Sequence, residues 1–289
     1  MDAATLAEIN SLESAIHDRL PLPPSPELEA RRQALLARHI GFTPSLPLPV
    51  LHVVGDSHSI FFGGAETIRF RKGRRIWTGF FRARYVSSTV ELMPVFKVFH
   101  VGPATAWQAD ERGSSTCARE KIDALLRSRD IPAGARILLV FGEIDCRCHI
   151  PKAVLAGRGI ETSVNETVDR FMRLPLRLKA AGHTPSVWLP SLTPVLGYAG
   201  NPNEIDALPV VGPQALRDEI TRAYCARLSE ACQRAGIRST GVTAPVNEPI
   251  PACFLDGHHL SQHMMPTALT ALIQAGILPL ESDAAPSPI

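Results

Sequence analysis

The sequence has little of several features that would mark a specialised class of protein. Six cysteines in 289 residues are too few for a disulfide scaffold at this length, so we expect free thiols. No apolar run approaches the roughly 20 residues needed to cross a bilayer. A formal charge of +2 is too small to indicate a nucleic-acid partner. With 45% hydrophobic and 20% charged residues, the chain is typical of a globular protein that can bury a substantial core.

The first 45 residues predict a helical arm ahead of the main domain. Apolar residues recur at helical spacing from Leu6 to Leu20, and a proline-rich segment then interrupts the pattern. A second helix is expected to begin with Ser25 as its N-cap and Pro26 in its first turn. Acidic residues are scattered through the first 20 positions, unlike in a secretory signal, so we expect a cytoplasmic protein. Residues 46–280 are predicted to form the main domain and residues 281–289 a flexible tail.

The main domain alternates short β-branched runs with helical patterns. The runs are Val50 to Val54, Phe96 to Val101, Arg136 to Phe141, Ser186 to Leu189 and, more weakly, Gly236 to Val242. The helical patterns are Thr116 to Arg129, Ser163 to Ala181, Pro213 to Ala235 and Ser261 to Ala275. This alternation predicts an α/β fold of three layers, in which helices cover both faces of a doubly wound parallel sheet. Such sheets carry their active site at the carboxyl ends of the strands.

The segment from Glu66 to Phe81 departs from this alternation. Its β-like pattern around Lys72-Gly73 predicts a β-hairpin inserted after the first strand. Five of the seven residues from Arg69 to Arg75 are cationic. These residues either recruit an anionic group of a substrate, such as a phosphate, a carboxylate or coenzyme A, or form an ordinary solvated hairpin.

Two segments at opposite ends of the main domain carry residues suited to acyl chemistry. Gly55-Asp56-Ser57 follows the first strand, where the serine hydroxyl would face the crevice and nearby N–H groups could stabilise an oxyanion. Asp256 and His259 precede the last helix, at a spacing that lets the carboxylate orient the imidazole as a base for the serine. Each segment also has a purely structural interpretation, as a capped turn. Their conjunction at one crevice favours catalysis.

These segments resemble the sequence blocks of the Ser-Gly-Asn-His (GDSL-like) hydrolase superfamily. Gly55-Asp56-Ser57 resembles block I, and Asp256-Gly257-His258-His259 resembles block V. Gly102 is placed like the glycine of block II, and Gly142-Glu143-Ile144-Asp145 is placed like block III. The resemblance covers roughly Val50 to Gly276 and includes all four blocks in their order along the chain.

The resemblance implies a role for each matching residue. Ser57 would be the nucleophile, His259 the general base and Asp256 the carboxylate that orients it. The backbone N–H groups of Ser57 and Gly102 would donate to the oxyanion.

The chain departs from the superfamily pattern at Ile144, where block III has an asparagine that donates to the oxyanion. Losing such a donor costs about 10²–10³ in rate. Arg147 either replaces this donor, binds a carboxylate or phosphate of the substrate, or pairs with Glu143 or Asp145 and braces the loop. Glu143 is then either an acid of the site or one half of that brace. The candidate oxyanion and substrate-binding residues are His58, Gly102, Glu143, Asp145 and Arg147.

Cysteines and histidines near these blocks leave two further alternatives. Potential metal ligands are Cys146, Cys148 and His149 on one segment and His258, His259 and His263 on another. The Cys-x-Cys spacing is not the usual one of structural zinc sites, and we expect neither a metal nor another cofactor. Cys146 could also be a nucleophile with a histidine as its base, but Ser57 is the stronger candidate.

The sequence therefore predicts a serine-dependent esterase or acyltransferase that works through an acyl-enzyme. The expected partner is a small polar or anionic acyl ester, or an acylated sugar, and neither a nucleic acid nor a membrane. The alternative is a protein of the same fold that binds a ligand, or catalyses a different reaction, in the same crevice. Ile144 is the main support for that alternative, and the complete set of Ser57, Asp256 and His259 argues against it.

Overall fold

The computed structural model describes residues 49–63, 74–77, 83–88, 95–191, 210–242, 254, 258–260 and 264–279. The predicted arm over residues 1–45 and the tail over residues 281–289 lie outside the described residues. So do Asp256 and the side chains of Arg69 to Arg75. No helix in the described ranges is long and apolar enough to cross a membrane.

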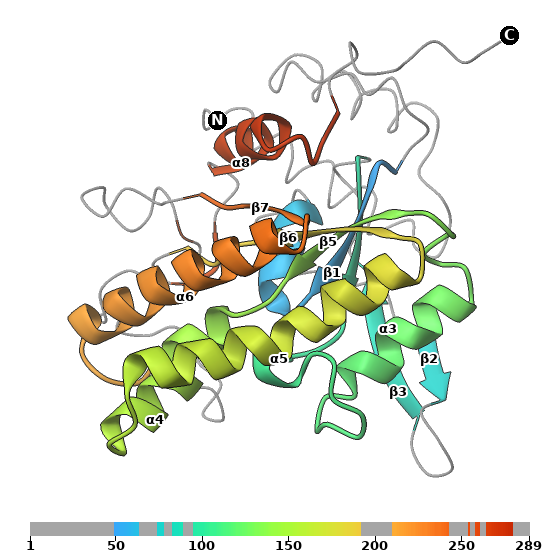
Figure 1. The fold of residues 1–289 in the computed structure, drawn as a ribbon. Helices are drawn as coiled ribbons and strands as arrows, with labels where there is room; N and C mark the ends of the chain where they lie inside the picture. Colours follow the sequence, from blue (N-terminus) through green and yellow to red (C-terminus); the bar gives the residue numbers. More distant parts are fainter. Residues whose placement is uncertain are drawn as a thin grey trace, which may run out of the picture.

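A seven-stranded sheet forms the centre of the molecule, in the order β2-β3-β4-β1-β5-β6-β7 (Figure 1). The strands are β1 (Leu51–Gly55), β2 (Arg74–Trp77), β3 (Ala83–Ser88), β4 (Phe96–His100), β5 (Arg136–Val140), β6 (Thr184–Trp188) and β7 (Arg238–Thr240). The five strands from β4 to β7 in this order are all parallel. The chain starts at β1, steps to β4 on one side and then continues through β5, β6 and β7 on the other. This is the 2-1-3-4-5 order of flavodoxin-like sheets, whose ligand crevice lies where the chain changes direction.

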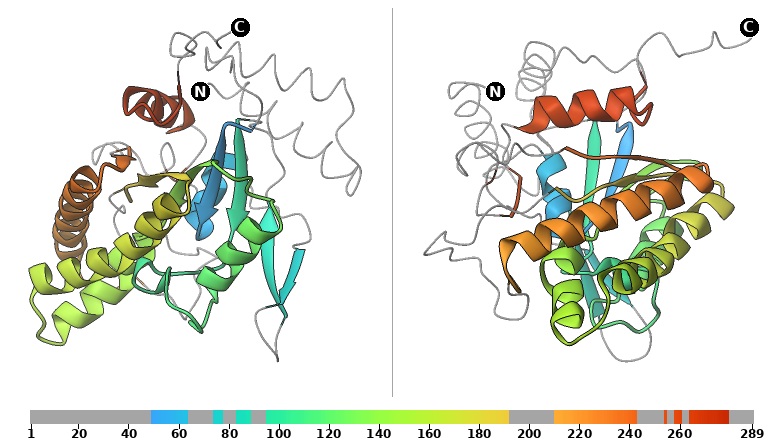
Figure 2. Two further views of the ribbon diagram at one scale, coloured as in Figure 1. Left: turned by 45° about the vertical axis from the view of Figure 1, so that its right-hand side comes forward. Right: turned by 60° about the vertical axis from the view of Figure 1, so that its left-hand side comes forward.

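Helices cover both faces of this sheet (Figure 2). One face packs on α3 (Ala118–Arg127), α5 (Ile160–Ala180) and α6 (Gln214–Arg234), and the other packs on η1 (Ser57–Gly63) and α8 (Met265–Gln274). Side chains alternate between the two cores along each strand. Val54 and Leu139 belong to the α3–α5–α6 core, while Val53 and Leu138 belong to the η1–α8 core. The three-layer α/β fold predicted from the alternation of strands and helices is confirmed.

The described residues include a β-hairpin after β1. β2 pairs antiparallel with β3, so the connection of this hairpin lies between Trp77 and Ala83. The turn predicted at Lys72-Gly73 lies outside the described residues and stays a prediction. β3 in turn pairs antiparallel with the edge of the parallel sheet, where Ser87 lies opposite His100. This second pairing fixes the register of the hairpin, and it cannot be read from local alternation alone.

Three short elements lie near the carboxyl ends of the strands. These are the 3₁₀ turn η2 (Ala106–Gln108), the π turn η3 (Asp145–His149) and the helix α4 (Ile150–Leu155). Because η3 continues directly into α4, the segment that follows β5 is wound rather than extended. Its residues therefore lie close to the carboxyl end of β1, the neighbour of β5.

Candidate active site

The close packing of β1 against β5 determines where Ser57 lies. A Cβ atom on Gly55 would come within 2.2 Å of the Val140 carbonyl oxygen, so only glycine fits at the end of β1. The next N–H, of Asp56, donates to the same carbonyl at 3.2 Å. The chain then turns into η1, in which the His58 N–H donates to Asp56 Oδ1 at 2.9 Å. Ser57 therefore lies at the carboxyl edge of the central strand, as the sequence predicts.

Ser57 and His259 are 202 positions apart in the chain, but their side chains meet. The distance between Ser57 Oγ and His259 Nε2 is 2.8 Å, a hydrogen bond in which the hydroxyl can donate to the ring nitrogen. The neighbouring Leu260 forms an isolated antiparallel β-bridge with Phe254. The expected proximity of Ser57 to His259 is thus observed, while the orienting role of Asp256 stays a prediction.

Three imidazole rings gather around the serine. The His58 ring stacks on that of His259 at a centroid distance of 4.5 Å and an interplanar angle of 26°. The ring centroids of His258 and His259 lie 4.2 Å apart. Burial, helped by the adjacent histidines, lowers the pKa of His258 to about 3. The His258 ring beside His259 is therefore neutral at physiological pH.

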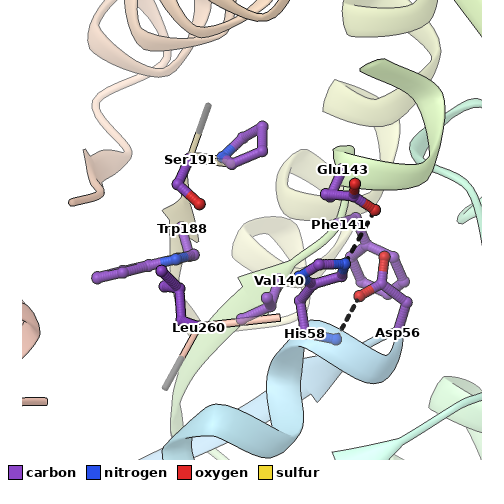
Figure 3. A pocket seen from close by; sticks show the side chains of 9 residues that line it. Asp56, His58, Val140, Phe141, Glu143, Trp188, Ser191 and Leu260 are labelled. Atoms are coloured by element: carbon purple, nitrogen blue, oxygen red, sulfur yellow. Dashed lines mark hydrogen bonds and ion pairs between the residues drawn. The ribbon is translucent and has the colours of Figure 1, made fainter. Parts of the chain in front are cut away.

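His58 also belongs to a buried chain of polar contacts with Glu143 and Arg147, and Figure 3 shows the contact between His58 and Glu143. His58 Nε2 lies 2.9 Å from Glu143 Oε2, and Arg147 Nε donates to Glu143 Oε1 at 2.7 Å. Burial alone would raise the pKa of Glu143, but His58 and the charge of Arg147 outweigh it and lower that pKa. Burial lowers the pKa of His58, and Glu143 only partly opposes this effect. We therefore assign a neutral His58 that donates from Nε2 to an ionised Glu143.

The contact between Arg147 and Glu143 is the brace considered among the sequence alternatives. Glu143 precedes η3 and Arg147 lies within it, so the pair is an i, i+4 contact in a wound segment. Both side chains are almost fully buried. The other roles considered for Arg147, as an oxyanion donor or as a ligand for a substrate anion, stay predictions.

The Asp145 carboxylate binds backbone N–H groups of η2, whereas Arg147 binds Glu143. Its carboxylate accepts from the Ala106 N–H at 2.6 Å and from the Trp107 N–H at 3.3 Å. Burial raises the pKa of Asp145 to about 7, and the two N–H donors only partly offset this. Asp145 thus anchors the loop between β4 and η2, the loop that carries Gly102.

Gly102 occupies the position expected for a block II glycine. It follows β4 and has a φ of +103°, a conformation that other residues rarely adopt. The neighbouring Val101 N–H donates to the Gly55 carbonyl at 2.9 Å, which holds the Gly102 loop against the segment that carries Ser57. The structure thus brings the loops of blocks I and II together, and the function of the Gly102 N–H stays a prediction.

A small cavity of about 20 Å³ lies beside His58. It has room for about one water molecule. The lining residues are Asp56, His58, Val140, Phe141, Glu143, Trp188, Pro190, Ser191 and Leu260 (Figure 3). Asp56 is fully buried, and within the described part of the chain its Oδ2 atom has no hydrogen-bond partner. Burial raises the pKa of this carboxyl well above its ordinary value, so Asp56 favours the protonated form.

The cysteine and metal alternatives gain no support from the structure. Burial raises the pKa of the Cys146 thiol well above its ordinary value, which disfavours the reactive thiolate. Cys148 is buried while the adjacent His149 is exposed, so these two side chains have different environments. Among the described residues, no group of three or more His, Cys, Asp or Glu side chains could hold a metal ion. His263 lies outside those residues.

Sequence reasoning named His58 and Glu143 separately and missed that they form a pair. Their positions could have indicated this pair. His58 follows the end of β1 and Glu143 follows the end of β5, and these two strands are neighbours in the sheet. Ile144, at the position of the superfamily asparagine, is 1% exposed, so its side chain is packed inside the protein.

Comparisons with known proteins place α/β hydrolytic enzymes among the structures similar to this one. No family model and no curated protein matches the chain. A candidate SGNH hydrolase from Slackia heliotrinireducens has 14% identity and a TM-score of 0.39, over 79% of this chain and 98% of that one. The acetylxylan esterase Axe2 from Geobacillus stearothermophilus, as a catalytic mutant, has 12% identity and a TM-score of 0.41, over 80% and 96%. The carbohydrate acetylesterase Est24 from Sinorhizobium meliloti has 14% identity and a TM-score of 0.39, over 77% and 99%.

Since these TM-scores are low, we base the functional conclusion on the geometry around Ser57 and His259.

Proposed function

We propose that the chain is a serine-dependent ester hydrolase or acyltransferase in which Ser57 is the nucleophile and His259 the general base. One observation carries this proposal: the 2.8 Å contact between Ser57 Oγ and His259 Nε2 at the carboxyl edge of the sheet. A histidine at this distance can accept the hydroxyl proton as the oxygen attacks an ester carbonyl. The alcohol then leaves with the proton that His259 returns, and a water or a second alcohol releases the acyl group from Ser57 in the same way.

Two further groups are assigned from the resemblance to the superfamily. Asp256 orients His259, and the N–H groups of Ser57 and Gly102 stabilise the oxyanion of the tetrahedral intermediate. The contact between Val101 and Gly55 supports the second assignment, because it holds the two donor loops together.

The site is suited to a short, polar or anionic acyl ester, including an acylated sugar. The polar rings of His58 and His258 lie beside His259, so the surroundings of the serine favour a polar ester over a long apolar acyl chain. An anionic part of the substrate would be recruited by the cationic segment from Arg69 to Arg75.

Steady-state kinetics with a short activated ester, such as p-nitrophenyl acetate, test this proposal. Ser57→Ala and His259→Ala should each lower kcat by about 10³-fold or more, since each removes one member of a single catalytic unit. The double variant should be about as slow as either single variant. A double variant that is much slower than both would show that the two residues act independently, contrary to the proposal.

A second candidate function is ligand binding, or a different reaction, in the same crevice. The observation that favours it is Ile144, which is buried at the position of a side-chain oxyanion donor. This candidate predicts that the unaltered chain turns over no ester and that Ser57→Ala changes nothing in the same assay.

A further inference from the structure

A second cleft, separate from the Ser57 site, lies between η2, α3 and α5. Its volume is about 270 Å³. The lining residues are Trp107, Asp110, Glu111, Arg112, Arg119, Arg170 and Arg173. Four of these seven side chains are arginines and two are carboxylates, so the cleft carries a net positive charge. None of the residues placed in the proposed catalytic site lines it.

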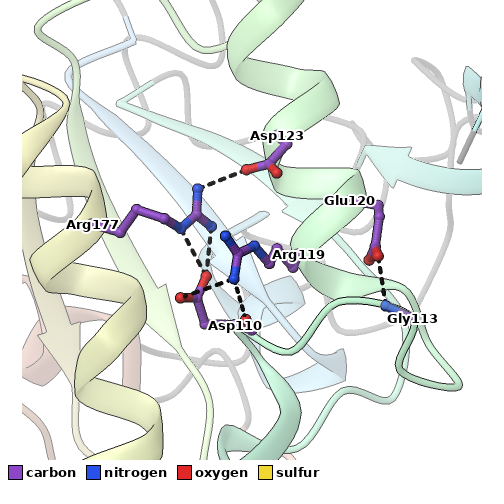
Figure 4. A network of polar contacts seen from close by, with 6 residues as sticks. All are labelled: Asp110, Gly113, Arg119, Glu120, Asp123 and Arg177. Carbon is purple, nitrogen blue, oxygen red and sulfur yellow. Dashed lines mark hydrogen bonds and ion pairs between the residues drawn. The ribbon is translucent and has the colours of Figure 1, made fainter.

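One of the two carboxylates is already neutralised by a network at the edge of the cleft (Figure 4). Arg177 from α5 pairs with Asp110 at 2.7 Å and, through another nitrogen, with Asp123 of α3 at 2.7 Å. Arg119 lies 3.7 Å from the Asp110 carboxylate and donates to its backbone carbonyl at 2.9 Å. Arg119 Nε is shielded from solvent and, in the described part of the chain, has no acceptor. The network therefore holds Arg119 in place and leaves one of its donors unsatisfied.

A second arginine is held by an aromatic ring. The Arg170 guanidinium lies over the Trp107 ring at 4.2 Å from its centroid, and one of its nitrogens lies 3.4 Å from the Glu111 carboxylate. The Trp107 backbone is itself bound to Asp145 through its N–H. Stacking fixes the plane of the guanidinium, and apart from the contact of Nη1 with Glu111 its edge is available for hydrogen bonds.

The remaining two arginines provide the excess charge. Arg112 and Arg173 are exposed, and no carboxylate within the described ranges pairs with either of them. The two arginines that are held in place and the two that have no carboxylate partner line one cavity. Guanidinium groups match the geometry of phosphate oxygens, which they bind in pairs. We propose that this cleft binds a multiply charged phosphate, as a diphosphate or the phosphate end of a larger molecule.

Isothermal titration calorimetry with inorganic pyrophosphate tests the proposal. We expect binding that weakens as salt is added, since exposed charges are screened over about 10 Å at 0.1 M. Arg112→Ala combined with Arg173→Ala should weaken pyrophosphate binding by at least about tenfold, because it removes two charge-assisted contacts. The matched control is Arg127→Ala combined with Arg222→Ala, which removes two exposed arginines outside the cleft and should leave the affinity unchanged.

Three outcomes would overturn this assignment: no binding to the unaltered chain, equal losses in the two double variants, or equal affinity for succinate and pyrophosphate. Thermal unfolding of both variants verifies that they fold. The titration does not depend on ester turnover, so its failure is distinct from failure of the proposed function.

Discussion

At the scale of single residues, His58 belongs to two interaction networks. Its ring stacks on the proposed base His259, and its Nε2 atom faces the buried pair of Glu143 and Arg147. Removing one partner of a buried ion pair is expensive, because it leaves the other charge uncompensated. The pair therefore holds His58 in one orientation, and His58 limits the positions that the His259 ring can adopt.

Ile144 provides the residue-scale prediction. An oxyanion donor stabilises charge that exists only in the transition state, so its absence lowers kcat more than it weakens binding. We expect weak hydrolysis of activated esters by the unaltered chain, and we expect Ile144→Asn to raise kcat by about tenfold or more with little change in KM. The measurement is steady-state kinetics, accompanied by thermal unfolding, since a buried amide without partners destabilises the protein by about 1–3 kcal/mol.

The matched control for this prediction is Ile144→Val, which keeps the position apolar and should leave kcat unchanged. If the asparagine variant folds but is no faster than the valine variant, position 144 does not face the oxyanion.

At the scale of elements, the parallel strands and the helices between them were predictable, whereas the turns between them were less so. Buried runs such as Arg136 to Phe141 have a composition that periodicity recognises, and β5 occupies Arg136–Val140. The π turn η3 was not predicted, because no local propensity distinguishes it from an ordinary helix. The same turn brings Glu143 within reach of Arg147. The sequence alone therefore indicated this ion pair as one of several roles for Arg147 and could not distinguish it from the others.

Asp145 provides the element-scale prediction. Asp145→Ala leaves the N–H groups of Ala106 and Trp107 without their acceptor, which should lower the free energy of unfolding by about 2–4 kcal/mol. Because η2 follows the Gly102 loop, we also expect a lower kcat with activated esters. Urea unfolding at pH 7 measures the first effect.

Asp169→Ala is the matched control for the loss of a carboxylate, because Asp169 is exposed and pairs only with Arg227 in the described residues. It should cost less than about 1 kcal/mol. Equal losses in the two variants would mean that Asp145 does not anchor η2.

At the scale of the whole molecule, the sheet brings together segments from both ends of the main domain. Because parallel strands present their carboxyl ends at one edge, the sequence could predict that Ser57 and His259 approach each other. It could not predict the stacking of His58 on His259 or the arginine cleft, which depend on how η1 and the helices α3 and α5 pack.

The pH dependence of stability is a whole-molecule property to which His100 contributes. Burial, together with the nearby charge of Lys121, lowers the pKa of His100 to about 4. The unfolded chain takes up this proton near pH 6.5 and the folded protein only near 4, so the contribution of His100 to stability is complete above 6.5 and is lost as the pH falls toward 4. The gap between these pKa values corresponds to roughly 3 kcal/mol.

We therefore expect the wild type to lose about this much stability relative to His100→Gln between pH 7 and pH 4. Urea unfolding of both proteins across this range measures the difference. A constant difference would show that His100 titrates normally in the folded protein.

The most direct test of the central claim, that Ser57 is a nucleophile activated by His259, is labelling with a fluorophosphonate probe followed by mass spectrometry. The probe reacts with an activated serine oxygen irrespective of the natural substrate, so neither the acyl group nor the acceptor needs to be known. We predict one adduct, on Ser57, which is absent in Ser57→Ala and forms at least about 10²-fold more slowly in His259→Ala. A wild-type protein that stays unlabelled, or a Ser57 adduct that forms equally fast without His259, would contradict the claim.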